Sequence, residues 1–101
     1  MISKAEKHEL IKPKEALEKT IKKACSKKDK YDVAASLLEG INRGHFFGSA
    51  NKRTSYIVTQ NFLKNNNEKV TKKTSDEEAR FLLKVRKGEV SKNKIKRWLK
   101  S

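Results

Sequence analysis

The chain has 101 residues, of which 35% are hydrophobic and 38% charged, and its formal net charge is +14. A chain of this length forms one domain with a single core, so we treat residues 1–101 as one domain. Its few apolar residues recur in periodic stripes, which predicts a folded chain rather than a disordered one. Lysine supplies nearly all of the excess charge and is spread over every segment. This pattern favours a solvated surface over a dedicated nucleic-acid interface, so nucleic acid stays an open but unfavoured partner.

The single cysteine, Cys25, excludes a disulfide within the chain and suits the reducing cytoplasm. It falls on the apolar side of a predicted helix, which favours a small core residue over a nucleophile. No apolar run approaches the length of a transmembrane helix, and the first residues lack the apolar core of a signal peptide. We therefore expect a cytoplasmic protein that is not secreted and has no membrane partner.

Helical periodicity dominates the N-terminal half of the sequence. Residues 1–11 are compatible with a short helix. Pro13 suits the first turn of the next helix, which runs to about Ser26. A charged turn at residues 27–30 leads to a helix over residues 31–42, and Gly44 follows it at a chain reversal. The two apolar stripes are Ala16, Leu17, Thr20, Ile21, Ala24 and Cys25, and then Tyr31, Ala34, Ala35, Leu37, Leu38 and Ile41.

A compact loop over residues 43–50 precedes a helix that restarts near Asn51 and is stopped by the three asparagines at 65–67. The apolar residues of this helix spread around more than one face, so we expect it to be the central, buried helix of the bundle. They are Tyr56, Ile57, Val58, Phe62 and Leu63.

Two further helices follow in the C-terminal part. Ser75 and Glu78 match a capping box, and Gly88 suits the end of that helix. Ser91 can cap the last helix. The expected stripes are Ala79, Leu82, Leu83 and Arg86, and then Ile95, Trp98 and Leu99. Short loops between short helices predict an all-α compact bundle, with a strand pair around residues 66–73 as a weakly signalled alternative.

The segment 44–54 carries the chemistry that the sequence suggests. A loop of small residues runs straight into a helix N-terminus, where unpaired backbone N–H groups and a partial positive charge favour phosphate. Asn51, Lys52 and Arg53 add side-chain donors at that end. His45, a few residues earlier, is suited to take a proton from a hydroxyl near neutral pH. Together they indicate phosphoryl or nucleotidyl transfer to a hydroxyl.

A plainer interpretation of the same residues is equally open from the residues alone. His45 can be a capping or packing histidine, and Lys52 and Arg53 can be surface charges. Phe47 belongs to the core in either interpretation.

Residues 45–53 resemble the signature of the Fic/Doc family. That signature has histidine, then phenylalanine two residues later, and ends in an acidic residue, glycine or alanine, asparagine, glycine or lysine, and arginine. Residues 50–54, Ala-Asn-Lys-Arg-Thr, are similar to the Doc branch, the death-on-curing toxins. The likeness extends over roughly residues 10–100, including the helices that flank the loop. It implies the compact helical bundle of that family.

The resemblance also implies roles for individual residues. His45 matches the general base, and Phe47 matches the buried aromatic residue that anchors the loop. Asn51 and Arg53 match residues that hold phosphate oxygens. Lys52 stands where AMP-transferring Fic enzymes have glycine, and in the Doc branch this lysine accompanies phosphoryl transfer. By resemblance the donor is ATP or another nucleotide, the target is an elongation-factor-like protein, and an antitoxin is a further partner.

Two positions depart from the family's pattern. Ser49 replaces the acidic residue that holds magnesium, and a neutral hydroxyl is a poor substitute for a carboxylate ligand. Phe46 replaces a proline or a smaller aliphatic residue. Tyr56 stands where AMP-transferring enzymes have a second arginine, as in the Doc branch. No metal ligand is therefore assigned, and magnesium stays in doubt.

The serine leaves three outcomes open: a weakened enzyme, an enzyme whose metal is held by phosphates and water alone, or a binding protein without chemistry. That last protein would bind a nucleotide or an antitoxin-like partner. We expect an impaired catalyst whose site still binds phosphate.

Overall fold

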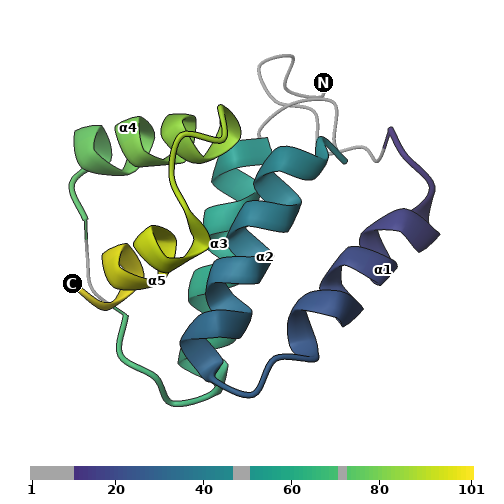
Figure 1. Ribbon diagram of the computed structural model, residues 1–101, viewed down its shortest axis with the longest axis horizontal. Helices are drawn as coiled ribbons and strands as arrows, with labels where there is room; N and C mark the ends of the chain where they lie inside the picture. Colours follow the sequence, from purple (N-terminus) through teal and green to yellow (C-terminus); the bar gives the residue numbers. More distant parts are fainter. Residues whose placement is uncertain (1–10, 47–50, 71–72) are drawn as a thin grey trace, which may run out of the picture.

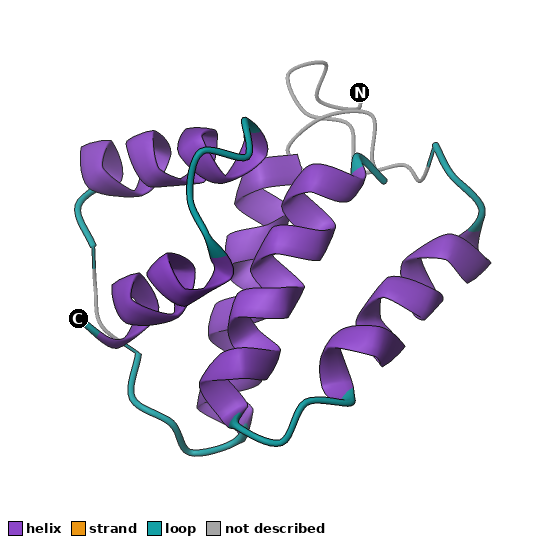
Figure 2. Cartoon of the chain, viewed as in Figure 1, coloured by secondary structure: helices purple, strands orange, loops and turns teal. Residues whose placement is uncertain are grey.

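The computed structural model describes residues 11–46, 51–70 and 73–101. These residues form α-helices joined by loops and contain no strand, which confirms the all-α class and removes the alternative of strands at 66–70 and 73 (Figure 2). The short helix expected within residues 1–11 lies almost wholly outside the described residues. None of the described helices is long and apolar enough to cross a bilayer. The helices are α1 Lys14–Cys25, α2 Lys30–Gly44, α3 Asn51–Asn65, α4 Ser75–Arg86 and α5 Lys92–Lys100.

The helix α2 is the element around which the others pack. It contacts each of the other four helices, and Figure 1 places α1 on one side of it and α4 and α5 on the other. Residues 33–38 of α2 are all buried, so the helix is covered on every side. The two alanines of this run, Ala34 and Ala35, are 0% exposed and leave room for neighbouring helices to approach closely.

The helix α3 lies antiparallel beside α2, but it is not the centre of the bundle that the sequence led us to expect (Figure 1). Its buried residues follow one face, and Ile57 on another face is 48% exposed. The apolar side chains had suggested burial on several faces, but Val58 and Phe62 are only half-buried. The buried face consists of Asn51, Ser55, Tyr56, Thr59 and Leu63.

Two clusters of buried side chains form the core, and α2 contributes to both. One cluster joins α2 to α3, α4 and α5, and the other joins α2 to α1. The first contains Ala34, Ala35, Leu38, Tyr56, Leu63, Leu82, Val85, Ile95 and Leu99. The second contains Ala24, Val33, Leu37 and Ile41.

The structure corrects several expected members of the apolar stripes. Ala79 and Arg86, which belong to the stripe expected on α4, are exposed. Cys25 is exposed, because it is the last residue of α1 and only Ala24 of that turn faces α2. Leu83 is 42% exposed, whereas Val85, which the expected stripe left out, is buried. The helix α4 presents Leu82 and Val85, three residues apart, to the bundle, so its neighbour Leu83 points outward.

The helix ends agree with the sequence in two of three respects. Ser91 accepts a hydrogen bond from the Lys94 backbone N–H, as expected for the cap of α5. Gly88 follows α4 in the left-handed conformation, with φ of 74°. The cap of α4 is Thr74 rather than Ser75, and its hydroxyl accepts from the Glu77 N–H at 3.1 Å. Threonine and glutamate three residues apart satisfy the same capping pattern one residue earlier.

A three-charge contact fixes α5 against the start of α2. The Lys96 ammonium lies 3.0 Å from an Asp29 carboxylate oxygen and 2.9 Å from one of Asp32. The hydrogen bond from Lys96 lowers the pKa of Asp29, and the two aspartates raise the pKa of Lys96. Asp29 also caps α2 by accepting from the Asp32 N–H at 3.2 Å.

This contact predicts how stability depends on pH. A carboxyl whose pKa is lower in the folded state stabilises that state above its ordinary pKa, and the contribution is lost as pH falls through the folded-state value. Lys96→Gln should therefore lower the free energy of unfolding at neutral pH, and the difference from the unmodified protein should narrow at pH ~2. Urea denaturation followed by circular dichroism measures both values.

Lys94→Gln is the matched control, since Lys94 is exposed on the same helix and the variant loses the same charge. An equal loss of stability in both variants, or a Lys96→Gln difference that does not change with pH, would contradict the assignment.

Candidate functional site

His45 lies directly after α2 and turns the chain in the left-handed conformation, with φ of 55° and ψ of 49°. Its side chain is half-buried. The sequence had suggested Gly44 for this reversal, but Gly44 is the last residue of the helix. A side chain in this conformation costs about 1–2 kcal/mol relative to glycine, so His45 holds a strained position.

Gly44 is needed for another reason, which is the packing of Phe46. The ring of Phe46 lies where a Cβ atom on residue 44 would be, so only glycine leaves the space. Phe46 is 4% exposed, and its backbone carbonyl accepts from the Ile11 N–H at 2.8 Å. The Lys12 ammonium lies 5.4 Å from the centre of the ring and also donates to the Gly44 carbonyl. Phe46 therefore anchors the chain where it leaves α2.

The sequence had assigned the anchor to Phe47. Phe47 and Ser49 fall in residues 47–50, which lie outside the described residues, so the expectation for Phe47 stays a prediction. The role of Phe46 was missed because it was considered only as a departure from a signature. The useful signal was the glycine two residues before it, which makes room for the ring.

The first turn of α3 brings the next candidate residues together. Asn51 is the first residue of the helix and is 3% exposed, Lys52 is half-buried and Arg53 is exposed. The first turn of any helix offers backbone N–H groups that the helix itself does not pair, and the helix dipole gives this end a partial positive charge. The turn therefore presents donors and positive charge at the end of α3.

A cleft of about 530 Å³ lies between α3 and α4. Lys52 and Arg53 line it from one side, and Asp76 and Glu78 from the other. The described lining therefore carries two cations and two carboxylates. This arrangement can bind a ligand with charges of both signs, or a phosphate whose charge is balanced by the two cations and the first turn of α3.

The structure brings Lys52 and Arg53 into one cleft and buries Asn51 beside them in the chain. His45 lies at the end of α2, and residues 47–50 join it to α3. Both helix ends lie at the same end of the antiparallel pair (Figure 1). Of the four candidate residues, Lys52 and Arg53 are among the described residues that line the cleft, whereas His45 and Asn51 are not. The convergence of all four on one anion-sized pocket therefore stays a prediction.

Tyr56 belongs to the core and not to the cleft. It is 5% exposed, and its ring centre lies 5.6 Å from that of Trp98, with the planes at 48°. Burial raises the pKa of its hydroxyl, which keeps the group neutral. Trp98 also stacks on Phe81 at 4.1 Å, so the three rings join α3, α4 and α5. The side chain at position 56 therefore packs in the core and does not bind phosphate in this fold.

The described residues contain no cluster that could hold a magnesium ion by protein ligands alone. No three histidine, cysteine, aspartate or glutamate side chains gather anywhere in residues 11–46, 51–70 and 73–101. The carboxylates nearest to Lys52 and Arg53 in the cleft, Asp76 and Glu78, share it with these two cations.

The contact between Gly44 and Phe46 predicts coupled effects on stability. Phe46→Ala should lower the free energy of unfolding by about 3 kcal/mol, because it empties a buried site. Gly44→Ala should lower it by about 1–3 kcal/mol, because the new methyl group overlaps the ring. In the double variant the ring is absent, so the added methyl group should cost little. Chemical denaturation of the four proteins measures this coupling, and simple addition of the two losses would contradict it.

The left-handed conformation predicts an unusual order of stability at position 45. The free energy of unfolding should be about 1 kcal/mol higher for His45→Gly than for His45→Ala, because only glycine adopts this φ without strain. Thermal and urea denaturation give the comparison. Equal stability of the two variants would show that residue 45 does not hold this conformation in solution.

Comparison with known proteins agrees with these observations. The model of the Fic/DOC family matches residues 3–63, which include α1, α2, the segment with His45 and nearly all of α3. A search of curated proteins returned no match. Since the matched stretch is more than half of the 101 residues, the chain belongs to the Fic/DOC family.

Proposed function

We propose that this protein is a Doc-type member of its family that transfers a phosphoryl group from a nucleotide to a protein hydroxyl, with impaired catalysis. The observation that carries the proposal is the position of the Asn51-Lys52-Arg53 sequence in the first turn of α3, a few residues after the strained His45. Family membership supports transfer of a phosphate-containing group, and the finer assignment is ours.

The residues have distinct tasks in this proposal. Lys52, Arg53 and the N–H groups of the first turn hold the phosphates of ATP or a similar nucleotide. His45 accepts the proton of the target hydroxyl as its oxygen bonds to the terminal phosphorus and the bond to the bridging oxygen breaks, releasing the nucleoside diphosphate. Asn51, which is buried at the start of the helix, adds a hydrogen-bonding group beside the phosphates.

Two residues support phosphoryl transfer over AMP transfer. Lys52 stands where AMP-transferring enzymes, by resemblance, have glycine. Tyr56 stands where they have a second arginine, and this position is in the core. The side chain at position 56 packs against Trp98 in the core, so the proposed site contains no second guanidinium group from this position.

Ser49 supports reduced activity. The family's metal-holding carboxylate is absent at this position, while the cations that bind phosphate are retained. Loss of metal-centred stabilisation of several kcal/mol slows transfer by orders of magnitude, because each ~1.4 kcal/mol is about tenfold in rate.

The partners follow from the same proposal. An elongation-factor-like cytoplasmic protein is the proposed target, and an antitoxin-like protein is the proposed inhibitor. The second candidate function is a family member that binds a nucleotide or such a partner without turnover. Ser49 is the observation that favours it.

Labelled ATP tests which function applies. In a cell extract, the γ-label should pass to a protein and the α-label should not. His45→Ala and His45→Gly should abolish transfer. The glycine variant is the sharper test, since its expected stability excludes unfolding as the cause. Ser49→Asp should raise transfer at least about tenfold and make it depend on magnesium.

Ser26→Asp is the control, because it adds the same charge at an exposed serine at the end of α1. Fast magnesium-dependent transfer by the unmodified protein would disprove the account of Ser49. No change in Ser49→Asp, with nucleotide binding retained, would favour the binding protein. Transfer of the α-label would replace phosphoryl transfer by AMP transfer.

A further inference from the structure

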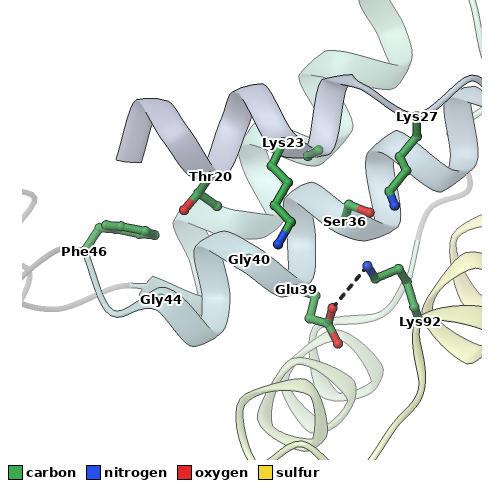
Figure 3. Close-up of a pocket in the computed structure, with 10 residues that line it drawn as sticks. Thr20, Lys23, Lys27, Ser36, Glu39, Gly40, Gly44, Phe46 and Lys92 are labelled. Atoms are coloured by element: carbon green, nitrogen blue, oxygen red, sulfur yellow. Dashed lines mark ion pairs between the residues drawn. The ribbon is translucent and has the colours of Figure 1, made fainter. Parts of the chain in front are cut away.

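A second concave site lies between α1 and α2, away from the cleft between α3 and α4. Its volume is about 280 Å³, just below the range of roughly 300–1,000 Å³ that is usual for small-molecule pockets. Figure 3 shows Lys23 and Lys27 reaching across it from the α1 side toward α2, while Lys92 enters from the start of α5. The site can therefore hold a small ligand between three elements of the bundle.

The hydroxyl of Ser36 is the feature that points to a ligand. Ser36 lines the cavity and is only 9% exposed, and its Oγ atom is buried without a hydrogen-bond partner. Helical hydroxyls elsewhere in this chain do find partners, since Thr59 donates to the Ser55 carbonyl at 2.7 Å and Thr20 to that of Ala16 at 3.1 Å. A buried hydroxyl without a partner is costly, so its natural partner is a group inside the cavity.

The charges around the cavity favour an anion. Lys23 and Lys27 form no ion pair with a described residue, whereas Lys92 lies 3.8 Å from Glu39. Glu39 is the one carboxylate in the described lining, and it also lies 3.7 Å from the Arg43 guanidinium. The negative charge of Glu39 is thus balanced by Arg43 and Lys92, and the ammonium groups of Lys23 and Lys27 are left to act on a ligand.

We propose that this cavity binds the phosphate group of a small ligand. The Ser36 hydroxyl donates to one phosphate oxygen, and the ammonium groups of Lys23 and Lys27 bind the others. A phosphate suits this set better than a carboxylate, because it offers more acceptor oxygens and up to two negative charges to a hydroxyl and two ammonium groups. The site is separate from the first turn of α3 and does not depend on the proposed transfer reaction.

Titration of the isotope-labelled full-length protein with inorganic phosphate, followed by NMR, tests the proposal. The largest amide shifts outside the motif should fall at Ser36 and Gly40 and in the α1 turn that carries Lys23. Ser36→Ala should weaken binding at this site about tenfold, since it removes a hydrogen bond to a charged group. Lys23→Gln combined with Lys27→Gln should weaken it further. Arg53→Ala should leave it unchanged.

The matched control is Lys64→Gln with Lys84→Gln, which removes two charges from exposed positions on α3 and α4. An equal effect of both double variants would reduce the binding to diffuse electrostatic attraction and overturn the proposal. Shifts confined to residues 51–54, or unchanged affinity in Ser36→Ala, would also overturn it.

Stability gives an independent readout of the same site. Without phosphate, Ser36→Ala should melt at the same or a higher temperature, because it removes an unpaired hydroxyl from a helix. Phosphate should raise the melting temperature of the unmodified protein more than that of this variant. A large loss of stability without phosphate would show that Ser36 has a structural partner, against the proposal. Repeating the titration with O-phosphoserine identifies the source: tighter binding than inorganic phosphate indicates a phosphate ester, and weaker binding indicates the free ion.

Discussion

The burial of α2 on all sides is the constraint on which the rest of the structure depends. A chain with so few apolar residues can cover only one helix completely, and here that helix is packed by all four others. Its run of small and apolar residues at 33–38 lets α1 and α3 approach it closely. Each of the other helices then needs only one apolar face, which matches the supply of apolar side chains.

The same constraint positions the functional residues. Because neighbouring helices pack against α2 on every side, its C-terminal end is fixed. The ring of Phe46 fills the space beside Gly44 and thereby holds the chain in place just after the helix. The helix α3 returns along α2, so its first turn lies at the same end of the bundle as His45. The proposed base and the proposed phosphate-binding helix end thereby lie at one end of the same helix pair, and transfer chemistry needs its groups held close together.

The sequence predicted the helices well, because each is bounded by strong local signals. Pro13 directly precedes α1, Ser91 caps α5, and Gly88 follows the end of α4. The errors concern features that local signals do not determine. Helical periodicity does not determine which of two neighbouring residues at the edge of a stripe is buried. Leu83 on α4 and Cys25 on α1 are such residues, and both are exposed. The structure places α2 and not α3 at the centre of the bundle, because burial on every side depends on how the other helices pack, and Ile57 of α3 stays 48% exposed.

The candidate site could be predicted in its residue types but not in its geometry. The motif pointed to Asn51, Lys52 and Arg53, and the structure gives them a helix N-terminus. The carboxylates of Asp76 and Glu78, which come from α4, could not be foreseen, since they reach the cleft only through tertiary packing. The cavity around Ser36 had no sequence signal either. A serine within an apolar run normally bonds to its own helix, and only the structure reveals that this one does not.

The conformation of His45 bears on the choice between a packing histidine and a functional one. If the residue served only to end α2, glycine would serve better, since it adopts a φ of 55° without strain. The nearby glycine is instead used one position earlier, where Phe46 requires it. The chain therefore accepts strain in order to keep an imidazole at the end of α2. Strained positions of this kind cluster at functional sites, which supports the proposed role of His45 as the base over a role in packing.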